Sequence, residues 1–148
     1  MSFFGVANGP RNGSKLVFLQ GLTPKEWSKV FTFAEMRKFT AGDNLVQAGD
    51  EDDSFYIMTA GSAEVLQGAQ TIGHIAEGSV FGEVAFFDRQ PRSASIRALE
   101  AGSAARFSRG AFENLAAWEP VLARRMLYEL GNALAIRLRA AEQRRDST

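Results

Sequence analysis

Short runs of apolar or alternating residues, each followed by a turn, fill the chain from Met36 to Ser108 and limit the possible folds more than any other feature. The runs are MRKFT, NLVQ, SFYIMTA, SAEVLQ, QTIGHIA, SASIRALE and SAARFS, and the turns after them commonly contain glycine. Strands of this length and spacing are typical of small antiparallel barrels. Glycine suits their corners because it adopts positive φ angles without steric cost. We therefore predict an antiparallel jelly-roll barrel, also called a double-stranded β-helix.

Helical patterns lie on both sides of these strands. A capping box formed by Thr23 and Glu26 predicts a helix that ends near Phe33. After the strands, a helix is expected over Arg109 to Ala117, and a longer one begins near Pro120, where proline suits the first turn. The sequence thus predicts an α+β fold that is mainly β, with helices at both ends.

Three segments are expected along the 148 residues. Residues 1–15 contain Asn-Gly-Pro and Asn-Gly-Ser turns, which indicate a flexible N-terminal arm. Residues 16–118 form the barrel with its flanking helices. Residues 119–148 form a C-terminal helix that serves as a lid or as a dimerisation element.

The charge and composition exclude several classes of partner. The chain has 17 basic and 17 acidic residues, so no net charge attracts it to nucleic acid or to acidic lipid. It has no cysteine, which excludes disulfides and cysteine metal sites. No signal peptide and no apolar stretch of membrane-spanning length are present. We expect a cytoplasmic domain without a membrane segment or a nucleic-acid partner.

The sequence contains few of the residues that catalytic or metal-binding sites need. His74 is the only histidine, so a metal-binding barrel with several histidines and a Ser-His-Asp triad are both disfavoured. The acidic run from Asp50 to Asp53 lacks the spacing of a calcium loop and is interpreted as a solvated turn. We expect no catalytic residue, no metal and no cofactor, and therefore a binding domain rather than an enzyme.

The stretch FGEVAFFDRQPRSASIRA, residues 81–98, concentrates the candidate binding groups. Gly82 and Glu83 open a short predicted helix that ends near Phe87, and free N–H groups at a helix start favour an anion. Arg92 offers a planar fork of donors that fits a phosphate. Glu83 only accepts hydrogen bonds when ionised, which suits a ribose hydroxyl. The alternative is a surface turn with an ion pair between Glu83 and Arg92.

This stretch resembles the phosphate-binding cassette of the cyclic nucleotide-binding domain family. The family's cassette reads F-G-E-φ-A-φ-φ, a short spacer, then P-R-x-A-[ST]-φ-x-A, where φ is an apolar residue, and the chain matches every fixed position. The corners Ala41-Gly42-Asp43 and Gly49-Asp50, and the run from Phe55 to Val65, also resemble the family. The resemblance extends from Leu19 to Ala141. It implies a sensor domain of the catabolite activator protein-like type that binds cyclic AMP or cyclic GMP.

The resemblance also implies roles for individual residues. Glu83 would bind the ribose 2′-hydroxyl, and Arg92 would bind the exocyclic oxygens of the cyclic phosphate. Other positions would provide backbone N–H groups or close approach: Gly82, Val84, Ser93 and Ala94. Val65 and Ile72, on facing strands, would form an apolar wall near the sugar and base.

Ser93 bears on the choice of base. Relatives with alanine at this position prefer cyclic AMP and relatives with threonine prefer cyclic GMP, while serine occurs in bacterial regulators that prefer cyclic AMP. The resemblance therefore leaves the base open and favours cyclic AMP. The threonine with which those regulators contact the base from their long helix would fall near Ala141 and Glu142, so contact between the lid and the base is also left open.

Signalling is expected through movement of the C-terminal helix toward an unknown effector protein. Bacterial regulators of the family append a helix-turn-helix, whereas this sequence ends at Thr148, so a stand-alone domain is expected. The alternatives are a regulatory domain of a larger channel or transcription regulator, and a helix-dimerised scaffold with a vestigial pocket. An apolar stripe suggests a homodimer, although a monomer with a folded-back lid fits as well. The stripe consists of Leu127, Leu130, Leu134, Leu138 and Ala141.

Overall fold

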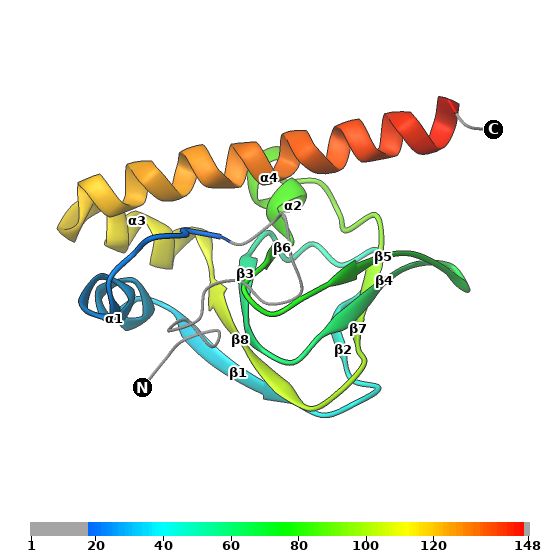
Figure 1. Cartoon of the computed structure of the whole chain (residues 1–148), viewed down its shortest axis with the longest axis horizontal. Helices are drawn as coiled ribbons and strands as arrows, with labels where there is room; N and C mark the ends of the chain where they lie inside the picture. The colour runs from blue at the N-terminus through cyan, green and yellow to red at the C-terminus, as the bar shows by residue number, and fades with distance from the viewer. Residues whose placement is uncertain (1–17, 147–148) are drawn as a thin grey trace.

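The computed structural model describes residues 18–146, so the predicted arm over residues 1–15 lies outside the described residues. Helix α1 (Pro24–Thr32) precedes the strands, and helices α3 (Arg109–Trp118) and α4 (Pro120–Asp146) follow them (Figure 1). The short helix α2 (Glu83–Asp88) lies between strands β6 and β7. The strands are β1 (Glu35–Phe39), β2 (Asn44–Val46), β3 (Phe55–Ala60), β4 (Ala63–Gln67), β5 (Gln70–Ile75), β6 (Val80–Phe81), β7 (Ser95–Ala98) and β8 (Gly102–Phe107).

The strands form two four-stranded sheets, with the orders β1-β8-β3-β6 and β2-β7-β4-β5. Every pairing of neighbouring strands is antiparallel. Two such sheets whose strands alternate between them make a jelly roll. The predicted α+β fold, an antiparallel jelly roll with helices at both ends, is therefore confirmed, although the described helices hold more residues than the strands.

Strand β3 shows how the two cores arise, because successive side chains of a strand point to opposite faces. Phe55 and Ile57 belong to the core that the first sheet shares with the helices. Tyr56 and Met58 belong to the second core, together with residues of the other sheet. All four side chains are at most 4% exposed, which explains the unbroken apolar run. The first sheet is thus covered on both faces and provides a rigid support.

The capping box of α1 forms as predicted. The Thr23 hydroxyl accepts a hydrogen bond from the Glu26 amide at 3.1 Å, and the Glu26 carboxylate accepts one from the Thr23 amide at 3.0 Å. The helix then buries Trp27 and Val30 in the core shared with the other helices. These contacts attach α1 to the core just before β1 begins.

Helix α4 is long and lies across the molecule above α2 (Figure 1). The backbone breaks at Glu119, whose φ of −133° and ψ of 66° separate α3 from α4. Trp118, just before the break, is 76% exposed and therefore neither packs in the core nor lines the cavity described below.

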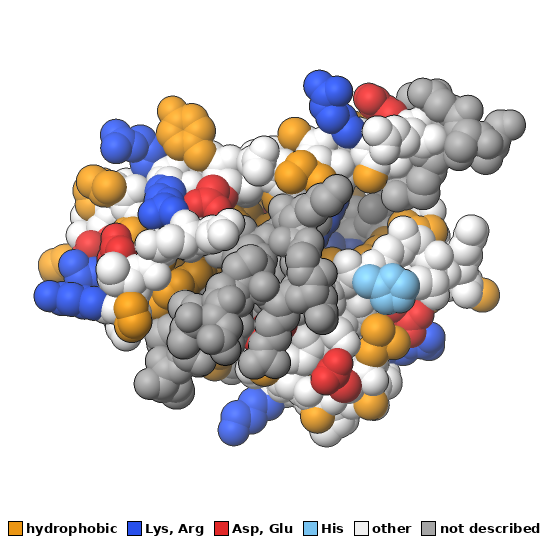
Figure 2. Space-filling model, viewed as in Figure 1, with side chains coloured by type: hydrophobic (Ala, Val, Ile, Leu, Met, Phe, Trp, Pro, Cys, Tyr) orange, Lys and Arg blue, Asp and Glu red, His pale blue; other side chains and the backbone are white. Residues whose placement is uncertain are grey.

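The predicted apolar stripe of α4 is wrong in one respect. Leu130 is completely buried in the protein's own core, whereas Leu127 and Leu138 are 41% and 58% exposed. The helix therefore presents an inward face, which includes Met126 and Leu130, and a separate outward face. Hydrophobic side chains are visible along the outward side of α4 in Figure 2.

Candidate functional site

Gly82 sets the geometry of the segment between β6 and α2. Its φ is +81°, in the left-handed region that favours glycine, and it serves as the N-cap of α2. A Cβ atom at this position would lie 3.0 Å from the Ser54 carbonyl oxygen and 3.0 Å from Nη1 of Arg92. The glycine therefore allows the chain to turn while the Arg92 side chain passes directly beside the backbone.

A cavity of about 490 Å³ opens next to this turn. Its walls come from β4, β5, the segment from β6 to β7, and the distal part of α4. All the residues that the sequence assigned to ligand binding line it: Val65, Ile72, Gly82, Glu83, Val84, Arg92, Ser93 and Ala94. The structure thus brings them around one cavity, while their roles toward a ligand stay predictions.

The apolar wall differs in detail from the expectation. Val65 and Ile72 lie on β4 and β5, which are neighbours in one sheet rather than facing strands. Val65 pairs with Gly73 and Leu66 pairs with Thr71, so Ile72 is an extra residue at an irregularity. Such a bulge changes the direction of a side chain, and it lets Ile72 join Val65 at the cavity although their strand positions do not match.

Arg92 is held in place at the distal end of its guanidinium group. Its side chain is only 4% exposed. Nη1 donates to the Gly82 carbonyl at 2.8 Å, and Nη2 donates to the Ser54 carbonyl at 2.5 Å and to the Asp52 carboxylate at 3.2 Å. The Nε atom is buried and has no hydrogen-bond partner among the described residues. A buried donor without a partner is costly, so Nε is the one nitrogen of this guanidinium group whose hydrogen-bonding capacity the described residues leave unused.

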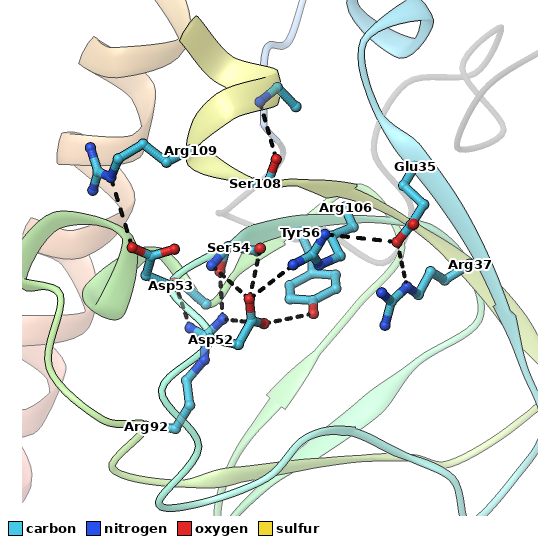
Figure 3. Close-up of polar contacts among 12 residues, drawn as sticks. Glu35, Arg37, Asp52, Asp53, Ser54, Tyr56, Arg92, Arg106, Ser108 and Arg109 are labelled. Atoms are coloured by element: carbon cyan, nitrogen blue, oxygen red, sulfur yellow. Dashed lines mark hydrogen bonds and ion pairs between the residues drawn. The ribbon is translucent and has the colours of Figure 1, made fainter.

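Asp52 is the centre of the network that holds Arg92 (Figure 3). Its carboxylate also accepts hydrogen bonds from the Ser54 hydroxyl at 2.8 Å, the Tyr56 hydroxyl at 3.1 Å and Nη2 of Arg106 at 3.1 Å. Burial alone would raise the pKa of Asp52, but hydrogen bonds from Ser54, Arg106 and Tyr56 outweigh it and hold that pKa well below its usual value. The interpretation of this acidic run as a solvated turn is therefore wrong at Asp52.

The next residue, Asp53, connects the cassette with the start of α3. Its carboxylate lies 3.5 Å from Nε of Arg89 and 3.8 Å from Nε of Arg109. Arg109 also donates to the Phe86 carbonyl, and its guanidinium carbon lies 4.7 Å from the centre of the Phe86 ring. Asp52 and Asp53 together thus contact arginines from the cassette, from β8 and from α3.

Glu83 pairs with a residue that the sequence interpretation missed. Its side chain is buried, and its carboxylate accepts a hydrogen bond from Nη1 of Arg137 on α4. Nη2 of Arg137 donates to the Val80 carbonyl at 2.6 Å. Glu83 and Arg92 therefore have separate partners, and the alternative of a surface turn closed by their mutual ion pair is wrong.

One sequence signal could have found Arg137. Leu130, Ala133 and Arg137 are spaced three and four residues apart, so they share one helix face. Leu130 and Ala133 are buried in the core, which places Arg137 on the inward side of α4. A charged residue on an inward face needs a partner of opposite charge. The partner itself could not be identified, because Glu83 is 54 residues away in the sequence.

No group of three residues able to hold a metal ion occurs among residues 18–146. His74 is exposed on β5 and belongs to the lining of the cavity. In the same part of the chain, no helix is both long enough and apolar enough to cross a membrane.

Comparison with known proteins identifies a family. The family model described as "Cyclic nucleotide-binding domain" matches residues 36–117. The cAMP-dependent protein kinase regulatory subunit of Colletotrichum orbiculare is 34% identical over 113 residues, which cover 75% of this chain and 29% of the relative. That of Hypocrea atroviridis is 34% identical over 110 residues, covering 74% of this chain and 24% of the relative. This chain thus spans less than a third of the length of these relatives.

Solved structures show the same fold. A cyclic nucleotide-binding domain from Methylobacillus flagellatus aligns over 96% of this chain and 79% of its own, with a TM-score of 0.75 and 24% identity. The catabolite activator protein of Thermus thermophilus aligns over 85% of this chain and 60% of its own, with a TM-score of 0.71 and 27% identity. The range matched by the family model includes the strands and the cassette that line the cavity, whereas Arg137 and Ala140 of α4 lie beyond it.

Proposed function

Because the chain belongs to the cyclic nucleotide-binding domain family, we propose that its cavity binds a cyclic nucleotide and that the domain is a sensor of this ligand. The observation that carries the proposal is the pair of buried charges at the cavity, Arg92 with an unpartnered Nε and Glu83 beside it in the cassette. A cyclic nucleotide carries an anionic phosphate next to a ribose hydroxyl, which fits one cation and one acceptor in this arrangement.

Each charged residue has one task in this function. Arg92 contacts the exocyclic phosphate oxygens with the Nε side of its guanidinium, because its distal nitrogens already donate to protein acceptors. Glu83 accepts a hydrogen bond from the ribose 2′-hydroxyl. Gly82, Val84, Ser93 and Ala94 supply backbone contacts, while Val65 and Ile72 pack against the sugar and base. The domain acts by binding, without a catalytic residue.

Cyclic AMP is the preferred ligand in this proposal. The fungal relatives are named as cAMP-dependent regulatory subunits, which supports the same base here. Ser93 is the one residue with a side-chain hydroxyl among the described residues that line the cavity, so it is the position at which a guanine could gain a hydrogen bond. The preference for cyclic AMP is consequently expected to be moderate.

Calorimetric titration with cyclic AMP and cyclic GMP tests the proposal directly. We expect saturable binding of one nucleotide per chain, tighter for cyclic AMP, with 5′-AMP as the control that lacks the cyclic phosphate. Arg92→Lys should weaken binding strongly. Absence of binding by the folded wild-type protein would contradict the proposal and leave a scaffold with a vestigial pocket.

The signal leaves the domain through α4. This helix contributes Arg137 and Ala140 to the cavity, so ligand and helix share one site. In this proposal α4 has two positions relative to the barrel. The ligand shifts the equilibrium between them to the extent that it binds one position more tightly than the other. The protein that receives this signal is an effector partner, as the regulatory-subunit relatives suggest.

The outward face of α4 is proposed to form a homodimer. Leu127, Tyr128 and Leu138 are exposed there, and a Cβ atom on Gly131 would meet no described atom within 4 Å. This part of the helix surface is therefore open to a second copy of the chain.

A further inference from the structure

Arg106 on β8 contacts the carboxylate that holds Arg92, although it is not among the described residues that line the cavity (Figure 3). Its Nη2 atom donates a hydrogen bond to Oδ1 of Asp52 at 3.1 Å. Arg92 donates to the other oxygen, Oδ2, at 3.2 Å. The side chain of Arg106 is 24% exposed, whereas that of Arg92 is 4% exposed. One carboxylate therefore lies between a buried arginine at the cavity and a second arginine nearer the surface.

The two oxygens of Asp52 are occupied by different donors. Oδ1 accepts hydrogen bonds from Arg106 at 3.1 Å and from the amide and hydroxyl of Ser54 at 3.2 and 2.8 Å. Oδ2 accepts hydrogen bonds from Arg92 at 3.2 Å and from the Tyr56 hydroxyl at 3.1 Å. A carboxylate has about four lone-pair sites. Asp52 therefore has no capacity left for a second nitrogen of Arg92.

This arrangement limits how Arg92 pairs with Asp52. An arginine and a free carboxylate commonly form two parallel hydrogen bonds. Here Arg92 gives Asp52 only Nη2, while Nη1 donates to the Gly82 carbonyl at 2.8 Å and Nε has no partner among the described residues. Arg106 occupies the oxygen that a second bond from Arg92 would need. It thus prevents Asp52 from holding the whole guanidinium group of Arg92 in a closed pair.

The charges lead to the same conclusion. Arg92 and Asp52 alone would form a neutral pair, which attracts an anion only weakly. Arg106 brings a second positive charge to the same carboxylate, so the group of three stays positive. Arg106 also lies 3.8 Å from a carboxylate oxygen of Glu35 on β1, but Glu35 is exposed and accepts a hydrogen bond from Arg37 at 2.7 Å. Water therefore screens the effect of Glu35 on the cavity.

We propose that Arg106 is a positioning residue of the phosphate contact: by engaging Asp52, it keeps Arg92 available for an anionic phosphate and keeps this side of the cavity positive. This inference rests on the proposed function. It gives β8, which lies between β1 and β3 in the first sheet, a part in ligand binding that the sequence of the cassette does not reveal.

Calorimetric titration of the full chain with cyclic AMP tests the role of Arg106. Arg106→Gln should lower the affinity about five- to tenfold, as expected when one member of a shared hydrogen-bond network is removed. Arg106→Lys should restore part of the affinity, because lysine keeps the charge but lacks the planar fork.

Arg97→Gln is the matched control. Arg97 also pairs with a carboxylate, that of Glu64 at 3.2 Å, but it lies on the other sheet and outside the described lining of the cavity. The control variant should bind cyclic AMP as the wild type does. A loss equal to that of Arg106→Gln would show a general effect of net charge and would contradict the inference.

A double-mutant cycle with Asp52 shows whether Arg106 acts through this carboxylate. In the Asp52→Asn background, Arg106→Gln should change the affinity by less than about twofold. A full loss in that background would show that Arg106 acts at a distance by its charge, and the inference would be wrong.

Glu35→Gln separates positioning from a merely structural role. This variant removes the outer ion pair of Arg106 but leaves its contact with Asp52 in place, so we expect no loss of affinity. A loss as large as that of Arg106→Gln would show that the ion pairs only support the fold, and would overturn the inference.

Thermal unfolding of each variant shows that binding is measured on folded protein. If Arg106→Gln does not fold, a loss of affinity in Arg106→Lys but not in Arg97→Lys supports the inference, and equal affinities contradict it. If the wild type binds cyclic AMP and a folded Arg106→Gln binds it equally well, the inference alone fails. If the folded wild type binds no cyclic nucleotide, the proposed function fails and the inference fails with it.

Discussion

Arg92 and Glu83 illustrate how the residue scale determines what this cavity can bind. Both side chains are buried, and each forms an ion pair with another residue of the protein. Such groups are positioned before the ligand arrives, so little ordering cost falls on binding. The partners, Asp52 and Arg137, are therefore as important to the site as the residues that contact the ligand.

Replacement of Arg92 by lysine tests the phosphate contact while keeping the charge. Lysine lacks the planar fork with which Arg92 reaches the Gly82 and Ser54 carbonyls. We expect Arg92→Lys to lower cyclic AMP affinity by ten- to a hundredfold, or about 1.5–3 kcal/mol. Calorimetry measures the affinity, and circular dichroism shows whether the fold is kept. An unchanged affinity would remove Arg92 from the phosphate site.

Ser93→Ala tests the choice of base. The variant removes a hydroxyl that guanine can use but keeps the backbone N–H for the phosphate. The expected result is a larger loss of affinity for cyclic GMP than for cyclic AMP, measured by parallel titrations. If both affinities fall alike, the side chain of Ser93 does not contact the base.

Asp52 predicts a dependence of stability on pH. Its pKa is held below the usual value, so its stabilising contribution is complete above the usual value of an aspartate, about 3.9, and is lost as the pH falls further. Asp52→Asn lacks this contribution at every pH. The difference in unfolding free energy between wild type and variant should therefore shrink between pH 5 and pH 2. Urea unfolding at several pH values measures it, and a constant difference would exclude this role for Asp52.

At the scale of elements, the conformation of the cassette, residues 81–98, follows from its own sequence. Its two charged residues, however, are held by partners from other parts of the chain. The strands, α1 and α2 were predictable because their signals are local: alternation, turn glycines and a capping box. Asp52 and Arg137 could not be assigned in the same way. Their contacts with Arg92 and Glu83 join residues 40 and 54 positions apart, and no local pattern encodes such pairs.

The inward and outward faces of α4 also could not be assigned from a local sequence pattern. A helical stripe predicts that several leucines share a side, but the neighbours of the helix decide which of them is buried. Leu130 packs inward with Met126, whereas Leu138 remains exposed. Likewise, the acidic run looked like a surface turn because the arginines that surround it come from the cassette, β8 and α3.

Gly82→Ala tests whether the turn before α2 can accommodate a side chain. An alanine there would be strained by the φ of +81° and would also press on the Ser54 carbonyl and Arg92, both 3.0 Å from the added carbon. Gly42→Ala is the matched control, since its φ is +92° but its surroundings are open. Strain alone costs about 1–2 kcal/mol. We expect Gly82→Ala to lose more stability than Gly42→Ala, and to lose nucleotide affinity as well. Equal thermal stability and unchanged binding would show that the turn tolerates a side chain.

At the scale of the whole molecule, the outward face of α4 is the part of the described surface that most resembles an interface. Val121 and Tyr128 are 66% and 75% exposed, and Leu127 and Leu138 are further exposed apolar residues of the same helix. Exposed apolar patches of this kind on one element commonly mark contacts with other proteins. A pair of identical helices related by a two-fold axis buries such a face on both copies at once.

Leu138→Glu should therefore convert a homodimer into a monomer without disturbing the fold, because this side chain is 58% exposed in the single chain. Leu99→Glu is the matched control: Leu99 is 46% exposed but lies in the turn between β7 and β8, away from α4. Light scattering of the wild type and both variants, each with and without cyclic AMP, measures the mass. We expect dimers for the wild type and Leu99→Glu and a monomer for Leu138→Glu. A monomeric wild type under both conditions would exclude the dimer and leave α4 to act on the cavity within a single chain.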